Sequence, residues 1–263
     1  MNASCKPVSS AANPLVKKMR ALSMKKYRDA DGIFMVEGLR HIREAFVAGW
    51  TAEIVAIAPH AAGDREVALV LQTCAQQGGT CISLTPELMQ RVTGRDNAQD
   101  VVAVFRQQWH ALSDAGNIIT GLENIRDPGN LGTIIRTADA AGAETVLLVG
   151  NTCDPYSPEA VRASMGSFAR MTFIRADFAT FLDWRRTWKG RVIGTSLDTD
   201  TDYRAADYTA PLLLMMGGEK DGLSADMTAA CDTLVKIPMR DTAESLNIAV
   251  ATGIMLYEVF RGK

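Results

Sequence analysis

The sequence of 263 residues lacks several features that mark common enzyme classes. Its three histidines, His41, His60 and His110, all precede residue 111. The second half of the chain therefore has no imidazole to serve as a base or a metal ligand, and a Ser-His-Asp hydrolase is hard to build there. A GxGxxG fingerprint and a GxxxxGK[ST] phosphate loop are also absent, which argues against a nucleotide-dependent oxidoreductase.

Cysteines are few and widely separated, and the sequence has no CxxC pair. An odd number of scattered cysteines argues against a disulfide framework or a zinc site and is compatible with a reducing, cytoplasmic location. No run of about 18 apolar residues occurs, so we expect no membrane span. The cysteines are Cys5, Cys74, Cys81, Cys153 and Cys231.

The charges are unevenly distributed although the net charge is only −2. Residues 1–45 contain nine Lys or Arg and four Asp or Glu, a net of +5, which leaves −7 for the remainder. This asymmetry indicates an anionic partner for the N-terminal part. A transit peptide is an alternative, since no acidic residue precedes Asp29. We favour a folded unit, because the basic stretch continues directly into predicted strands and helices.

The first 107 residues show alternating helix and strand patterns, which are typical of a small α/β unit. Its first predicted helix is strongly basic. The polar stretch that follows is interpreted as a linker at 108–116. We expect helices at 14–28, 38–48, 64–76 and 86–92, and strands at 33–36, 53–58, 80–84 and 100–105.

A second series of elements fills residues 117–263. Its strands are continuous apolar runs, a pattern that predicts a parallel sheet covered on both faces. The helix that starts at Pro128 has one apolar stripe, with Arg136 on the opposite side. We expect strands at 118–122, 145–150, 171–174, 191–196, 212–216 and 233–237, and helices at 128–141, 158–168, 178–188, 224–230 and 245–260.

Three loops at predicted strand ends concentrate polar residues and glycine, at residues 123–136, 215–224 and 237–247. Ligands usually bind at the carboxyl ends of strands in open α/β sheets, and glycine allows a ligand to approach the backbone closely. Each loop taken alone is more often an ordinary turn. Asn130 would then begin a helix, and Arg136 would be a solvated surface residue.

Taken together, the loops make residues 117–263 resemble the SpoU (TrmH) branch of the SPOUT RNA methyltransferases. The resemblance rests on DPGNLGTIIRTADAAG (127–142), GGEKDGLS (217–224) and IPMRDTAESLNIAVA (237–251), supported by DPYSPEAVRASMGS (154–167). Lys220 and Asp241 stand where the family often has glycine. Residues 9–49 resemble the RNA-binding domain that precedes the methyltransferase domain in many members.

The resemblance implies a fold and an activity. The fold would be α/β, a parallel sheet with a C-terminal trefoil knot, preceded by a small α/β RNA-binding domain. The protein would be a homodimer, with both subunits building each site, and would use S-adenosylmethionine to methylate a ribose 2′-oxygen in RNA. Ribosomal RNA is the first choice of substrate. Transfer RNA is an alternative, as is a non-catalytic RNA-binding or ribosome-assembly protein on the same scaffold.

The resemblance also implies roles for particular residues. Arg136 would be catalytic, and because arginine stays protonated, its plainer role is to clamp a phosphate and stabilise negative charge on oxygen. The same site would include Asn130, Glu219, Ser245 and Asn247. The cofactor would be held by Gly217, Gly218, Glu219, Ile237, Met239 and Leu246. RNA would be contacted by Lys17, Lys18, Arg20, Lys25, Lys26 and Arg28, and Arg162 and Ser164 would contact RNA or the second subunit.

Overall fold

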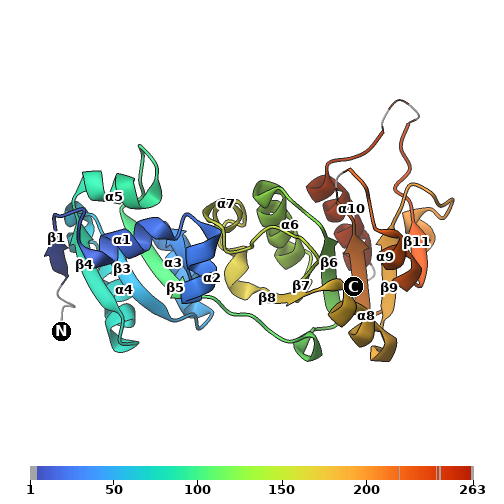
Figure 1. The fold of residues 1–263 in the computed structure, drawn as a ribbon, viewed down its shortest axis with the longest axis horizontal. Coiled ribbons are helices and arrows are strands. Elements are labelled where there is room, and N and C mark those ends of the chain that lie inside the picture. The colour runs from blue at the N-terminus through green and yellow to red at the C-terminus, as the bar shows by residue number, and fades with distance from the viewer. Residues whose placement is uncertain (1–4, 219, 241, 243, 262–263) are drawn as a thin grey trace. The chain divides into compact units, whose positions relative to one another are not determined.

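The computed structural model describes residues 5–218, 220–240, 242 and 244–261 (Figure 1). The chain divides into two compact units: Met1–Gln107 with Tyr156–Ala169, and Gln108–Pro155 with Arg170–Lys263. Residues 156–169 group with unit 1, although in the sequence they lie between segments of unit 2. No helix among the described residues is long and apolar enough to cross a membrane.

Unit 1 is built on a mixed sheet of five strands in the order β1-β4-β3-β5-β2. Strands β1, β4 and β3 are parallel, and β5 runs antiparallel to β3 and β2. Strand β1 was not predicted from the sequence. The elements of unit 1 are β1 (Lys6–Val8), α1 (Pro14–Ala21), α2 (Lys25–Asp31), β2 (Ile33–Glu37), α3 (Leu39–Val47), β3 (Ala52–Ile57), α4 (Arg65–Gln76), β4 (Thr80–Leu84), α5 (Pro86–Thr93), β5 (Val101–Arg106) and α7 (Pro158–Ala163).

The predicted basic helix is two helices, because the chain turns at residues 22–24 between α1 and α2. The turn leaves backbone carbonyl groups without partners in a helix, and buried carbonyl groups need a donor. The buried Arg28 side chain supplies it, donating from Nη1 to the carbonyl oxygens of Leu22 at 2.8 Å and Ser23 at 3.0 Å. A periodicity argument does not detect such a break, since both helices have similar compositions.

Strand β2 separates the two cores of unit 1, because successive side chains of a strand point to opposite faces. Ile33 and Met35 pack on one side with Val16 and Met19 of α1. Phe34 points to the other side and enters an aromatic cluster with Trp50, Tyr156 and Phe168. Its ring centroid lies 5.5 Å from that of Trp50, 4.6 Å from that of Tyr156 and 5.6 Å from that of Phe168.

Half of this aromatic cluster comes from the segment 156–169. Tyr156 and Phe168 are fully buried, and Trp50 donates from Nε1 to the carbonyl oxygen of Ala169 at 2.9 Å. Edge-to-face aromatic contacts and a satisfied indole N–H are both stabilising. The segment therefore completes the core of unit 1, although its sequence lies between two strands of unit 2.

Unit 2 is a sheet of six strands in the order β11-β9-β10-β6-β7-β8, and every neighbouring pair is parallel. The predicted parallel sheet is confirmed. Strand β10 is buried along its whole length, as its uninterrupted apolar sequence indicates. The elements are β6 (Ile118–Glu123), α6 (Pro128–Ala140), β7 (Thr145–Val149), β8 (Thr172–Ala176), α8 (Phe178–Thr187), β9 (Arg191–Thr195), β10 (Leu212–Met216), α9 (Ala225–Ala230), β11 (Thr233–Val235) and α10 (Ile248–Arg261).

The predicted linker is attached to unit 2. The backbone N–H of His110 donates to the carbonyl oxygen of Phe173 at 2.9 Å, and His110 forms a parallel bridge with Ile174. The guanidinium carbon of Arg175 lies 4.0 Å from the ring centroid of Trp109. Residues 108–116 therefore pack beside β8.

We expect Phe168→Ala to destabilise unit 1 by about 3–5 kcal/mol, because it removes a fully buried aromatic side chain. Hydrogen exchange should become faster in β2 and β3, while β6 and β10 keep their protection. Phe181→Ala is the matched control, since Phe181 of α8 is equally buried in the core of unit 2. This variant should speed exchange in β6 and β10 and leave β2 and β3 protected. Unchanged protection of β2 in Phe168→Ala would contradict the role given to the segment.

Candidate active site

Unit 2 contains a pocket of about 790 Å³ at the carboxyl ends of β9, β10 and β11. Parallel strands end at the same edge of a sheet, and ligand sites of α/β proteins usually lie there. The pocket is lined by the loops that follow these three strands and by the start of α10. The predicted cofactor residues that line it are Gly217, Gly218, Ile237, Met239 and Leu246, together with the predicted catalytic residue Ser245. Glu219 lies outside the described residues.

Gly217 has no room for a side chain. A Cβ atom at this position would lie 2.0 Å from the carbonyl carbon of Gly222 and 2.2 Å from the backbone nitrogen of Leu223. The loop turns back on itself, since the backbone N–H of Gly222 donates to the carbonyl oxygen of Gly218 at 3.0 Å. Gly222 has a φ of +66°, which glycine adopts without strain. Backbone atoms therefore form much of this wall of the pocket.

Glu123 holds the same loop in place and was not predicted from the sequence. Its side chain is buried at the end of β6, and its Oε2 accepts the backbone N–H of Ser224 at 2.9 Å. The Ser224 hydroxyl in turn accepts the N–H of Met227 and caps α9. The sequence does show a carboxylate at the end of an apolar strand. That Glu123 holds the loop after β10 could not be predicted, because it depends on β10 pairing with β6.

Asn130 and Asn247, predicted to share one site, are in contact. The Asn247 Nδ2 donates to Asn130 Oδ1 at 3.1 Å, across 117 residues of sequence. Asn247 Oδ1 also accepts the backbone N–H groups of Ala249 and Val250 and so caps the start of α10. The first and third motifs are thus joined by a direct hydrogen bond.

Arg136 does not line the pocket. It is exposed on α6, on the side opposite the buried Leu131 and Ile135. Its side chain has no hydrogen bond or ion pair with any residue in the described part of the chain. Arg136 is therefore available to a partner outside this chain.

The prediction missed two groups of pocket residues. Residues 195–198, after β9, form one wall, and Lys220 and Asp221 line the loop after β10. The strand order needed to bring β9 beside β10 is not visible in the sequence, so the loop after β9 carried no specific signal. Lys220 thus faces the pocket where the family often has glycine, and Asp241 lies outside the described residues.

Five of the predicted RNA-binding residues lie at the surface of α1 and α2 in unit 1. Lys18 pairs with Glu53 and Lys25 with Asp29, and Lys26 lies over the Tyr27 ring. Arg28 differs from them: its buried guanidinium holds the turn between the helices, as described above, so its assignment to RNA is corrected. The exposed or half-exposed set is Lys17, Lys18, Arg20, Lys25 and Lys26.

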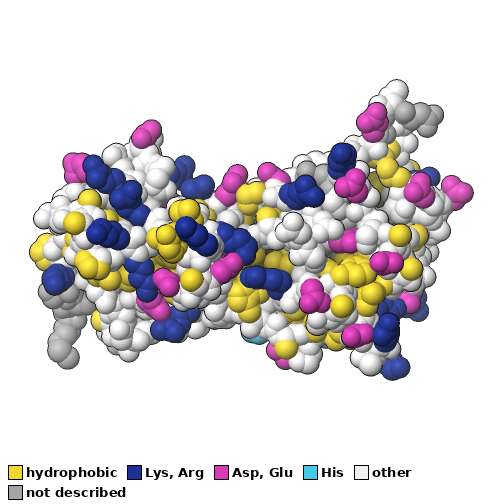
Figure 2. Space-filling view, viewed as in Figure 1, with side chains coloured by type: hydrophobic (Ala, Val, Ile, Leu, Met, Phe, Trp, Pro, Cys, Tyr) yellow, Lys and Arg dark blue, Asp and Glu magenta, His cyan; other side chains and the backbone are white. Residues whose placement is uncertain are grey.

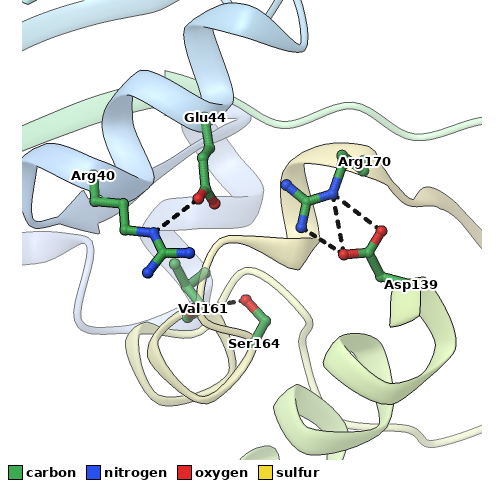
Figure 3. Close-up of polar contacts among 6 residues, drawn as sticks. All are labelled: Arg40, Glu44, Asp139, Val161, Ser164 and Arg170. Carbon is green, nitrogen blue, oxygen red and sulfur yellow. Dashed lines mark hydrogen bonds and ion pairs between the residues drawn. The ribbon is translucent and has the colours of Figure 1, made fainter. Parts of the chain in front are cut away.

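Ser164 is also corrected, because it is fully buried and its hydroxyl donates to the carbonyl oxygen of Val161 at 2.7 Å (Figure 3). Arg162 remains half-exposed, with Nη1 lying 3.6 Å from Oε1 of the buried Glu37. Burial raises the pKa of Glu37, and the positive charges of Arg162 and Arg95 oppose that shift. Glu37 therefore holds Arg162 against β2 of the same unit, while part of the Arg162 guanidinium faces solvent.

Comparison with known proteins identifies the family. The model of the SpoU rRNA Methylase family matches residues 117–257, and that of the MRM3-like substrate binding domain matches residues 13–103. This chain belongs to the SpoU rRNA methylase family.

Three relatives are similar to it over nearly their whole length. The chain is 30% identical to the 23S rRNA (guanosine(2553)-2'-O)-methyltransferase RlmP of Bacillus subtilis, over 97% of this chain and 99% of that protein. The AdoMet-bound rRNA methyltransferase from Sinorhizobium meliloti is 41% identical, with a TM-score of 0.92 and 98% of each chain covered. The methyltransferase AviRb from Streptomyces viridochromogenes, in complex with AdoMet, is 29% identical, with a TM-score of 0.86 and coverage of 95% and 98%.

We expect Gly217→Ala to lower the free energy of unfolding by about 1–3 kcal/mol and to weaken cofactor binding, because the added methyl group forces the loop apart. Gly218→Ala is the control for stability, since the nearest atom to its Cβ would be the carbonyl oxygen of Asn124 at 3.4 Å. Denaturant unfolding and calorimetric titration measure the two effects. Equal stability of the two variants would show that the described loop shape is wrong.

Proposed function

We propose that this protein transfers a methyl group from S-adenosylmethionine to the 2′-oxygen of a ribose in ribosomal RNA. One observation carries the proposal most directly. Five residues that the family motifs assign to the cofactor, from two separate loops, line a single pocket. The chain also aligns from end to end with a 41% identical rRNA methyltransferase that binds AdoMet.

The pocket fits S-adenosylmethionine, which supplies an already activated methyl group when it is bound. Its volume of about 790 Å³ lies within the range of roughly 300–1,000 Å³ found for small-molecule sites. Ile237, Met239 and Leu246 offer apolar surface for an adenine ring, and the backbone at Gly217 and Gly218 offers hydrogen-bonding groups without side chains in the way. We also assign Glu219 to this loop from its place in the motif.

The protein's own residues would align the hydroxyl group and stabilise the charge that develops on its oxygen. Arg136 would clamp an RNA phosphate and lie near the attacking oxygen, because a guanidinium keeps its charge and donates several hydrogen bonds. Asn130, fixed by Asn247, would orient the ribose or Arg136. Ser245, at the pocket, would complete the site near the methyl group together with Asn247.

A homodimer explains two features of unit 2. Arg136 is exposed and does not line the pocket, so a second copy of the chain would bring the two together. Helix α10 is also strongly apolar, yet Val250 and Tyr257 are 53% and 54% exposed. Covering such side chains is the usual role of a dimer interface.

The same proposal includes a C-terminal trefoil knot. Two observations support the knot. Both motif loops line one pocket, and the hydrogen bond between Asn130 and Asn247 fixes the start of α10 against α6. A crystal structure traced through these loops tests the knot. We propose a cytoplasmic location because the five cysteines are free thiols, and cell fractionation tests it.

Ribosomal RNA is preferred to transfer RNA because the full-length relatives named above act on 23S rRNA or carry the name of rRNA methyltransferases. A non-catalytic RNA-binding or assembly protein on this scaffold is the second candidate. Arg136, Asn130, Ser245 and Asn247 are all present, which favours catalysis. Cofactor binding measured by calorimetry separates the two, since a non-catalytic protein has no need for S-adenosylmethionine.

We expect Arg136→Ala to lower the rate of methylation by about 10²–10³ while cofactor affinity stays the same, because Arg136 stabilises charge and lies outside the pocket. Single-turnover transfer from labelled cofactor measures the rate. Arg136→Lys keeps the positive charge but lacks the planar guanidinium with its paired N–H donors, so it should recover only part of the lost rate. Full turnover in Arg136→Ala would remove Arg136 from the mechanism.

We expect Tyr257→Glu to convert the dimer to a monomer and to abolish methylation, because it places a charge in the proposed apolar interface. Sedimentation velocity measures the mass. Leu69→Glu is the control, since Leu69 is similarly exposed at 55% but lies on α4 of unit 1. A monomeric wild-type protein with full activity would contradict the dimer proposal.

A further inference from the structure

Unit 1 contains a hollow whose cations pair with no carboxylate among the described residues. Elsewhere in the unit, Arg40 pairs with Glu44 and Arg43 with Glu66. Lys17, Arg20 and Arg91 instead line one hollow of about 430 Å³, and none of them has an ion pair with a described carboxylate. No acidic side chain lines this hollow within the described part of unit 1.

The packing of α1 against α5 brings these cations together. Lys17 and Arg20 are three residues apart on α1, so they lie on one side of the helix, while Val16 and Met19 face the core. Arg91 lies in the last turn of α5, which packs against α1. Figure 2 shows lysine and arginine side chains gathered over α1 and α5. Like charges repel, so this arrangement favours an anion in the hollow.

The hollow differs from a plain basic patch because part of its lining is apolar. Met35 and Val92 are buried at its base, and Met24 is 50% exposed beside it. Pro158, the first residue of α7, forms a further part of the lining. An anion alone needs cations and N–H donors, whereas an apolar lining beside the cations can also hold an unstacked nucleobase.

We propose that this hollow binds one unstacked nucleotide of single-stranded RNA, with its phosphate on Lys17, Arg20 and Arg91 and its base on Met24, Val92 and Pro158. The inference rests on the proposed function, since that function supplies RNA as the substrate, and it adds a second RNA site in unit 1. Proteins read RNA mainly through splayed bases in loops and bulges, because the grooves of a paired helix hide the bases. The site therefore selects loop or bulge RNA over a duplex.

The substrate-binding part of the chain is consequently incomplete without α7. Residues 13–103 match the substrate binding domain, yet Pro158 comes from the sequence that matches the SpoU rRNA Methylase family. The segment 156–169 thus contributes both to the aromatic cluster of unit 1 and to the nucleotide site. A single segment of the methylase sequence supports the core and the ligand site of unit 1.

The test compares two double variants of the full-length protein. Arg20→Ala with Arg91→Ala removes two cations from the hollow, and Arg43→Ala with Arg65→Ala removes two exposed cations from helices α3 and α4 of the same unit. The probe is a short single-stranded oligoribonucleotide carrying 4-thiouridine, and a fully paired duplex of the same sequence is the comparison. Anisotropy titrations at several salt concentrations measure affinity, and illumination with long-wave ultraviolet light maps contacts.

We expect the hollow variant to bind the single strand about tenfold more weakly, with a salt slope lower by about 0.7 for each phosphate that the protein no longer neutralises. The affinity of the control variant for the single strand should fall much less. The affinity for the duplex should fall only slightly, and by the same amount in both double variants. Crosslinks should fall within residues 17–24, 91–94 or at Pro158. Met24→Ser, which keeps the charge, should also weaken single-strand binding. Equal weakening in the two double variants, or the absence of crosslinks at these hollow residues, would overturn the proposal.

Methylation kinetics separate this inference from the proposed function. If the wild-type protein methylates ribosomal RNA, the hollow variant should show a raised KM for RNA and an unchanged kcat at saturation. An unchanged KM would reject the nucleotide site and leave the proposed function intact. If the wild-type protein methylates no RNA, the proposed function fails, and binding and crosslinking alone decide the nucleotide site.

Discussion

The parallel order β11-β9-β10-β6 is the constraint on which the proposed active site depends. Since the strands all run the same way, the loops that follow them are forced to one edge, and three of these loops line the pocket. Glu123 and the Asn130–Asn247 hydrogen bond then fix the loop after β10 and the start of α10. Without this order, the motif residues would be scattered polar turns.

Much of the fold could be predicted from the sequence, because buried parallel strands are continuous apolar runs and helix starts carry recognisable caps. Strand β10 and helix α6 lie almost where the pattern places them. Long-range packing was the part that periodicity could not provide. Neither the break that Arg28 stabilises between α1 and α2 nor the membership of residues 156–169 in unit 1 has a local signal.

The candidate site shows the same limit. The family motifs pointed to the loop around Gly217 and to the loop at 237–247, and both line the pocket. At Gly217 no side chain fits, so the sequence of this loop is a specific signal. Residues 195–198 were missed because their role follows from the position of β9 beside β10. The resemblance assigned Arg28 and Ser164 to RNA, but both are buried and form internal hydrogen bonds.

The most direct test of the central claim uses labelled S-adenosylmethionine with ribosomal RNA and transfer RNA taken from cells that lack this protein. Labelled RNA is then treated with alkali, which cleaves through the 2′-hydroxyl and so spares a linkage whose 2′-oxygen is methylated. We expect label in ribosomal RNA at an alkali-resistant linkage. Label in an alkali-sensitive nucleotide, or no transfer to free RNA or ribosomal particles together with no cofactor binding, would contradict it.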